Sequence, residues 1–274
     1  MTATQESTAA HAVSRDGTHI GYYTTGQGPP LVLVHGGLGD HTRWAALRPY
    51  LEPHFTVCAM DRRGRGASGD HSDYDVAREF EDVAAVVDAV ADSTTSHVTV
   101  VGSSAGASFA VAAAALTPNI GRLVLFEPAT GELMKLLPPE LQDQLDALLA
   151  ADDREGILQT AYRQLVGLSD EQIDDLRAQP SWANRLTAAH TVPRELRIPP
   201  ERFFDPRQAE AVAVPALVMI GGETPEPFRV GAQHVADTLP HASVAVLEGQ
   251  GHGAELFAPA LVADAMLEFL GEGA

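Results

Sequence analysis

The chain has 274 residues, of which 45% are hydrophobic, and its formal net charge at pH 7 is −19. This length and composition allow one large domain with a full core and argue against a disordered chain. The acidic charge is spread along the sequence without a basic segment, so we expect neither a nucleic-acid partner nor binding to an anionic membrane. Residues 1–16 lack the apolar core of a secretory signal, so cytoplasmic residence is the default expectation.

Short apolar runs predict a mostly parallel sheet. Near-continuous hydrophobicity of this kind is typical of parallel strands that are covered on both faces. The runs are residues 31–34, 56–60, 98–101, 123–126, 216–220 and 244–247. The segment 19–24, ahead of a Gly-rich turn, predicts an antiparallel edge strand. Apolar positions at helical spacing predict helices over 74–91 and near 261–270. Alternating helices and strands predict a doubly wound α/β fold.

The pattern changes between Pro128 and Pro206. Strand-like runs stop there, and amphipathic segments alternate with prolines. A stretch of about 75 residues is far longer than a usual connection between strands. We therefore expect a helical cap over residues 131–205, inserted into a core made of residues 1–130 and 206–274.

The segment from residue 98 to 116 predicts a nucleophilic serine. An apolar strand runs into Gly102-Ser103-Ser104-Ala105-Gly106, and an Ala-rich helix follows. In a nucleophile elbow the residues two before and two after the serine must be very small, because strand and helix backbones approach each other closely there. Gly102 and Gly106 occupy those two positions around Ser104. We therefore expect Ser104 to be the nucleophile.

Two further segments supply possible partners for Ser104. The strand 31–34 ends in His35-Gly36-Gly37, a loop type that donates a backbone N–H to an oxyanion, so we expect the N–H groups of Gly37 and Ala105 to form an oxyanion hole. Gly36 is expected to border the substrate. His252 follows the last predicted strand on a glycine-flanked loop, near the sheet edge where open α/β sheets bind ligands. We assign it as general base and then general acid.

Together these segments resemble the α/β-hydrolase fold with a cap. The resemblance covers residues 15–130 and 210–270 and rests on His35-Gly36-Gly37, the Asp61-to-Ser68 loop, the Ser104 elbow and Gly251-His252. It implies a catalytic acid between the serine and the histidine. The loop after 216–220, which usually carries this acid as aspartate, reads Gly-Gly-Glu-Thr-Pro-Glu. Some members place the acid after the preceding strand, where Glu127 stands, so Glu127 is the expected acid and Glu223 the alternative.

The elbow, Glu127, the cap segment around Trp182 and the loop Gly222 to Pro225 also resemble the fungal zearalenone lactone hydrolases. This second resemblance implies that Trp182 lies over the substrate and that the bond cleaved is an ester or a lactone. Simple packing of Trp182 within the cap is the alternative for that residue.

Other signatures point away from cofactors and metals. The glycines of residues 64–69 precede a polar turn rather than the helix that a dinucleotide site requires. The chain has neither a phosphate-binding loop nor a His-Glu-x-x-His motif or Cys/His cluster. We therefore expect no cofactor and no metal.

The sequence thus predicts a serine hydrolase of small hydrophobic carboxylic esters or lactones, acting through an acyl-enzyme as a monomer or homodimer. A carbon–carbon or thioester hydrolase using the same triad is one alternative, because the fold does not fix the bond cleaved. A ligand-binding relative with little turnover is the other.

Overall fold

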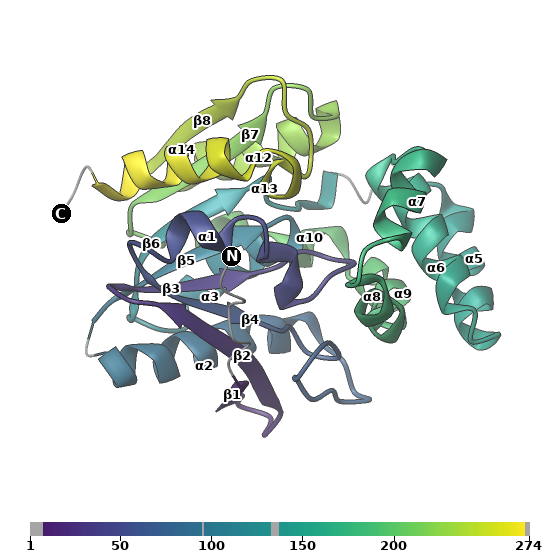
Figure 1. Ribbon diagram of the computed structural model, residues 1–274, viewed down its shortest axis with the longest axis horizontal. Helices are drawn as coiled ribbons and strands as arrows, with labels where there is room; N and C mark the ends of the chain where they lie inside the picture. Colours follow the sequence, from purple (N-terminus) through teal and green to yellow (C-terminus); the bar gives the residue numbers. More distant parts are fainter. Residues whose placement is uncertain (1–7, 95, 133–136, 272–274) are drawn as a thin grey trace.

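The computed structural model describes residues 8–94, 96–132 and 137–271. They contain an eight-stranded sheet in the order β1-β2-β4-β3-β5-β6-β7-β8, flanked by helices (Figure 1). The strands are β1 (Ala10–Val13), β2 (His19–Gly26), β3 (Pro30–Val34), β4 (Thr56–Met60), β5 (Val98–Ser103), β6 (Ile120–Phe126), β7 (Ala216–Gly221) and β8 (Ala242–Leu247).

The predicted doubly wound α/β fold is confirmed. Strands β3 to β8 pair in parallel, and they coincide with the apolar runs of the sequence. Strand β2 pairs antiparallel to β4 as expected, but it is not the edge of the sheet, because β1 pairs outside it. Only Ala12 of β1 is buried, so this strand has no apolar run that a sequence pattern could reveal.

Helices cover both faces of the sheet, because alternate strand residues point to opposite sides. In β3, Val32 and Val34 join one core cluster, whereas Leu31 and Leu33 join the other. The first cluster includes α2 (Val76–Thr94), α3 (Ala105–Ala114) and α12 (Glu226–Thr238). The second includes η1 (His41–Trp44), α1 (Arg48–Leu51), α13 (Ala254–Phe257) and α14 (Pro259–Gly271).

The chain between β6 and β7 is helical in the part that the structure describes. We call α5 to α9 the helical insertion: α5 (Pro139–Ala150), α6 (Arg154–Ala161), η2 (Tyr162–Val166), α7 (Asp170–Arg177), α8 (Trp182–Ala188) and α9 (Thr191–Leu196). Figure 1 shows them as a separate group beside the sheet. They share a hydrophobic cluster of their own, centred on residues such as Leu145 and Ile157. Two short helices, α10 (Pro200–Phe203) and α11 (Pro206–Ala209), lead back to β7.

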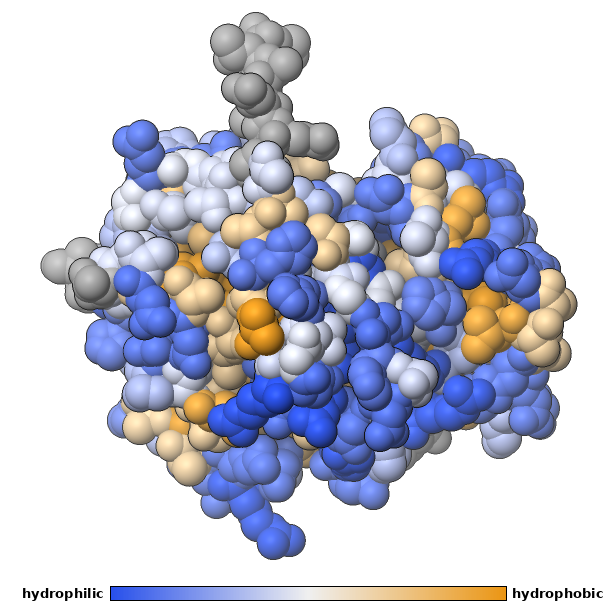
Figure 2. Space-filling model, turned by 90° about the horizontal axis from the view of Figure 1, so that it is seen from below, coloured by the Kyte–Doolittle hydropathy of each residue, from blue (hydrophilic) through white to orange (hydrophobic). Residues whose placement is uncertain are grey.

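The surface agrees with the acidic composition. On the face seen in Figure 2, hydrophilic residues dominate and hydrophobic residues form small separate groups. Among the described residues, no helix is both long enough and apolar enough to cross a bilayer.

Candidate active site

Ser104 stands at the sharp turn between β5 and α3, at the N-terminal end of the helix. Its backbone has φ 53° and ψ −122°, a conformation that L-residues adopt only under strain. The turn is stabilised by the Ser104 N–H, which donates to the Phe126 carbonyl at 2.9 Å. Such strain at a single serine is typical of a functional position, because the surrounding fold must compensate for it.

The glycines on either side of Ser104 are required by the close approach of the backbones. A Cβ atom on Gly102 would lie 2.4 Å from the Ala107 Cα, and one on Gly106 would lie 2.3 Å from the Val34 carbonyl oxygen. Both distances are far below van der Waals contact. The spacing that predicts an elbow from sequence therefore has its expected steric cause here.

His252 and Glu127, from loops far apart in sequence, meet in the structure. The His252 Nδ1 atom lies 2.5 Å from the Glu127 Oε2 atom. Glu127 is fully buried, and it also accepts hydrogen bonds from the Gly221 N–H at 2.7 Å and the Thr224 hydroxyl at 2.9 Å. A carboxylate only accepts, so the imidazole Nδ1 donates and its Nε2 is left free to accept a proton.

The structure separates the two candidate acids. Glu127 follows β6 with φ 41° and bonds to His252, whereas Glu223 is exposed on the loop after β7. The backbone N–H of Glu223 donates to the Gln250 carbonyl, so the main chain of this residue joins the loop after β7 to the loop that carries His252. Its carboxylate is not among the groups that contact His252.

Gly37 and Ala105 both border the cavity that contains Ser104. Among the hydrogen bonds of the described residues, neither of their N–H groups has an acceptor. For Ala105 this follows from its place in the first turn of α3, where N–H groups have no intrahelical partner. Two free donors beside a serine can stabilise a developing oxyanion.

His35 anchors this loop from the core. It is fully buried, and burial together with the charges of Arg62 and Arg65 lowers the pKa of His35 well below its ordinary value. The neutral ring donates from Nδ1 to the Gly36 carbonyl at 2.8 Å and accepts the Arg62 N–H at its Nε2 at 3.1 Å. His35 is thus a support for Gly36 and Gly37, and Gly36 lines the cavity as expected.

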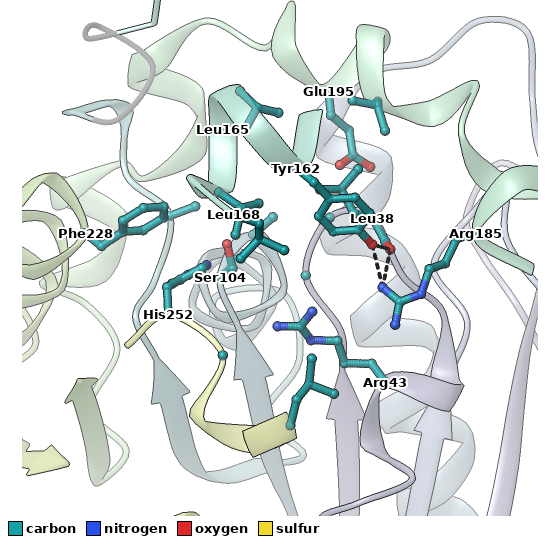
Figure 3. A pocket seen from close by; sticks show the side chains of 18 of the residues that line it. Leu38, Arg43, Ser104, Tyr162, Leu165, Leu168, Arg185, Glu195, Phe228 and His252 are labelled. Atoms are coloured by element: carbon teal, nitrogen blue, oxygen red, sulfur yellow. Dashed lines mark hydrogen bonds between the residues drawn. The ribbon is translucent and has the colours of Figure 1, made fainter. Parts of the chain in front are cut away.

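The helical insertion holds the other side of the same loop. Leu38, next to Gly37, has φ 61°, an uncommon backbone conformation for a non-glycine residue. Its carbonyl accepts hydrogen bonds from the Tyr162 hydroxyl at 3.2 Å and from the Arg185 Nη1 atom at 3.3 Å (Figure 3). Tyr162 begins η2, a π-helical turn of the kind that is frequent at functional sites.

A buried ionic network also joins the insertion to this loop. Arg62 donates to the Gly36 carbonyl at 3.0 Å, to both oxygens of Glu79 and to Glu195 on α9 at 2.7 Å. Arg65 donates to the same oxygen of Glu195. Burial by itself would raise the pKa of Glu195, but the charges of Arg62 and Arg65 outweigh it, and the pKa is lowered. Glu195 is therefore an ionised carboxylate at the cavity wall.

Ser104 and His252 face one cavity, whose remaining lining comes from the core and from the insertion (Figure 3). Its apolar side chains include Leu38, Leu165, Val166, Leu168, Leu176, Val192, Leu196, Phe203, Phe228, Leu256 and Phe257. Phe228 stacks on the His252 ring with centroids 4.0 Å apart. An apolar cavity with a few convergent polar groups is the usual form of a small-molecule site.

Trp182 does not line this cavity. It is buried in the cluster of the helical insertion and stacks on Tyr162, with ring centroids 6.2 Å apart. Tyr162 in turn lines the cavity, so Trp182 contacts a wall residue from behind. Tyr162, Arg185 and Glu195 were not predicted as site residues, because no local motif distinguishes them within their amphipathic helices.

Within the part of the chain that the structure describes, one group of side chains has spacing that could suit a metal ion, namely Asp40, His41 and Asp61. The Asp61 carboxylate is already an acceptor for the His41 N–H at 2.9 Å, the His41 ring at 2.8 Å and the Ala67 N–H at 2.8 Å. Burial opposes the charge on His41, but the hydrogen bond that its ring donates to Asp61 and the charges of both aspartates raise the pKa of His41. These N–H donors favour a hydrogen-bonded loop anchor over a cation site.

Comparison with known families gives a match along most of the chain. A family model described as "Alpha/beta hydrolase family" matches residues 31–265. A solved structure described as an alpha/beta hydrolase from Sphaerobacter thermophilus is 37% identical in sequence with a TM-score of 0.82. The superposition covers 95% of this chain and 100% of that one.

Two curated proteins are also similar. Pyrrolizixenacetamide deacetylase from Xenorhabdus hominickii is 35% identical over 108 residues, which make up 39% of this chain and 40% of the deacetylase. The 2-hydroxy-6-oxo-6-(2'-aminophenyl)hexa-2,4-dienoic acid hydrolase from Metapseudomonas resinovorans is 24% identical over 271 residues. That match covers 94% of this chain and 89% of the relative.

Proposed function

Because the chain belongs to the alpha/beta hydrolase family and is a hydrolytic enzyme, we propose that it hydrolyses carboxylic esters with Ser104, His252 and Glu127 as its catalytic triad. One observation carries the proposal: the strained Ser104 faces the same cavity as His252, whose ring is bonded to the buried Glu127. Nucleophile, base and orienting acid are the three parts that acyl transfer by a serine requires.

The proposed reaction has two steps. His252 accepts the Ser104 proton at Nε2 while the serine oxygen attacks the ester carbonyl, and the resulting oxyanion accepts hydrogen bonds from the Gly37 and Ala105 N–H groups. The imidazolium, stabilised by Glu127, then gives the proton to the leaving alcohol, which leaves an acyl-serine. Water activated by His252 releases the acid and restores Ser104. A lactone is a cyclic ester, so the same steps would open one.

Residues 131–205 are proposed to act as a cap over this site, with residues 1–130 and 206–274 as the catalytic core. The proposal is supported by the position of the insertion in the chain, between β6 and β7, and by the lining residues that it supplies. Its contacts with the Leu38 carbonyl and with Arg62 support a second role, which is to hold the oxyanion loop.

The nucleophile can be tested without knowledge of the substrate. We expect a fluorophosphonate probe to form one adduct on the intact protein, located at Ser104 by peptide mass analysis. The adduct should be absent in Ser104→Ala and present in the control Ser103→Ala, because the Ser103 hydroxyl donates to Glu255 rather than facing the cavity. A folded protein that takes no label, or takes it at another serine, would contradict the proposal.

The support of the oxyanion loop gives a second, smaller expectation. Tyr162→Phe removes one of the two side-chain donors to the Leu38 carbonyl. Because a small displacement of Gly37 weakens stabilisation of the transition state, we expect kcat for ester hydrolysis to fall about 10-fold. Steady-state kinetics beside the exposed control Tyr50→Phe would measure this. An unchanged kcat would mean that Tyr162 does not position the loop.

A further inference from the structure

Arg185 is an unusual residue for the wall of a mainly apolar cavity. It lies on α8, is 5% exposed, and lines the cavity together with Ser104 and His252. In the view of Figure 3, Arg185 and Phe228 stand at opposite sides, and Ser104 and His252 lie between them. A substrate that occupies this cavity would therefore present one end to Arg185 while its ester reaches Ser104.

The hydrogen bonds of Arg185 use only part of its guanidinium. Its Nη1 atom donates to the Tyr162 hydroxyl at 2.5 Å and to the Leu38 carbonyl at 3.3 Å, both of which are neutral groups. Its Nε atom is buried and has no hydrogen-bond partner, and its Nη2 atom has no acceptor among the described residues. Two neighbouring N–H groups of this kind form the edge that binds a carboxylate with two parallel hydrogen bonds.

The charge of Arg185 also lacks a counter-ion, unlike the other charged groups at this wall. Arg43 pairs with Glu255 at 2.7 Å, and Glu195 is shared by two buried arginines, Arg62 and Arg65. Among the described residues, no carboxylate oxygen lies within 4.0 Å of the Arg185 guanidinium nitrogens. Burying an unpaired guanidinium is costly, so a site that retains one is suited to receive an anion.

We propose that Arg185 binds a carboxylate of the substrate, so that this enzyme prefers esters that carry an acidic group. The inference rests on the proposed function, because it places the carboxylate at Arg185 while the ester carbonyl lies at Ser104. It adds a substrate class to that function: monoesters of dicarboxylic acids and other esters with one free carboxylate.

The test compares two esters of the same shape. One is the para-nitrophenyl monoester of glutarate, and the other is the para-nitrophenyl ester in which an isopropyl group replaces the free carboxylate. We expect the wild-type protein to have the higher kcat/KM for the acidic ester. In Arg185→Met we expect the ratio of the two kcat/KM values to fall about 100-fold, because a buried charge partner is lost.

The ratio separates recognition from structural support. Loss of the Arg185 bond to the Leu38 carbonyl would slow both esters equally and cancel in the ratio. Arg177→Met is the matched control, because it removes the same charge from an exposed position on the insertion, and it should leave the ratio unchanged. If Arg185→Met does not fold, Arg185→Lys keeps the charge but not the two-donor edge, and we expect the ratio to fall about 10-fold.

The outcomes distinguish this inference from the proposed function. The inference would be overturned, and the proposed function would stand, if Ser104 is labelled and both esters are hydrolysed but the ratio of their kcat/KM values is the same in wild type and Arg185→Met. If neither ester is hydrolysed and no label forms, the function fails, and calorimetry then decides the inference alone. The glutarate monoester should bind Ser104→Ala about 100-fold more tightly than Ser104→Ala with Arg185→Met, and equal binding would overturn the inference.

Discussion

Replacing Glu127 by glutamine is expected to lower kcat for ester hydrolysis by about four orders of magnitude, while the fold is retained. The side chain keeps its size, so its amide oxygen can still accept from the Gly221 N–H, and its NH₂ group then takes the place of the oxygen that binds the Thr224 hydroxyl and the His252 ring. The amide is neutral, however, and it cannot stabilise the imidazolium that His252 becomes during the reaction. Its NH₂ group can also face Nδ1 and favour the wrong tautomer.

Glu223→Gln is the matched control, because it makes the same chemical change on the other candidate acid. Its side chain is exposed and does not contact His252, so we expect kcat to change less than about twofold, as is usual for surface positions. Kinetics of both variants on one ester, with circular dichroism to verify folding, would make the comparison. A large loss of kcat in Glu223→Gln and a small loss in Glu127→Gln would identify Glu223 as the catalytic acid.

The parts of the site that a sequence pattern could predict are those fixed by local sterics. Gly102 and Gly106 flank Ser104 because any side chain there would collide with backbone within the same strand-turn-helix unit. Glu127 was a less direct prediction, since it depended on family resemblance. Its structural basis is that β6 lies beside β5 in the sheet, which brings the end of β6 to the elbow.

The parts that sequence could not predict depend on packing between distant segments. Arg62 and Glu195 are 133 positions apart. Arg62 belongs to the loop 61–68 on which the family resemblance rests, but no local pattern pairs it with Glu195. Trp182 is the opposite case, a candidate for substrate contact that does not line the cavity. A large aromatic in a predicted cap could contact substrate or pack internally, and only the arrangement of the helices places it behind Tyr162.

The buried ionic network around Arg62 leads to the second large expected effect, a loss of stability. Arg62→Met is expected to lower the free energy of unfolding by about 3–5 kcal/mol, because it leaves the buried Glu79 without its ion-pair partner and Glu195 with only Arg65. Denaturant unfolding would measure the loss. Arg163→Met, which breaks the exposed pair with Asp170, should cost less than about 1 kcal/mol.

The pH dependence of the Arg62→Met effect provides a further check on its cause. The pKa of Glu195 is lowered in the folded protein, so its ion pairs stabilise the fold above the ordinary pKa of a glutamate and cease to do so as the pH falls through the lowered value. The stability difference between wild type and Arg62→Met should therefore be largest near neutral pH and should narrow in acid. A difference that stays constant with pH would indicate that Arg62 stabilises the protein by contacts other than its ion pairs, for instance with the Phe109 ring, whose centroid lies 4.6 Å from its guanidinium carbon.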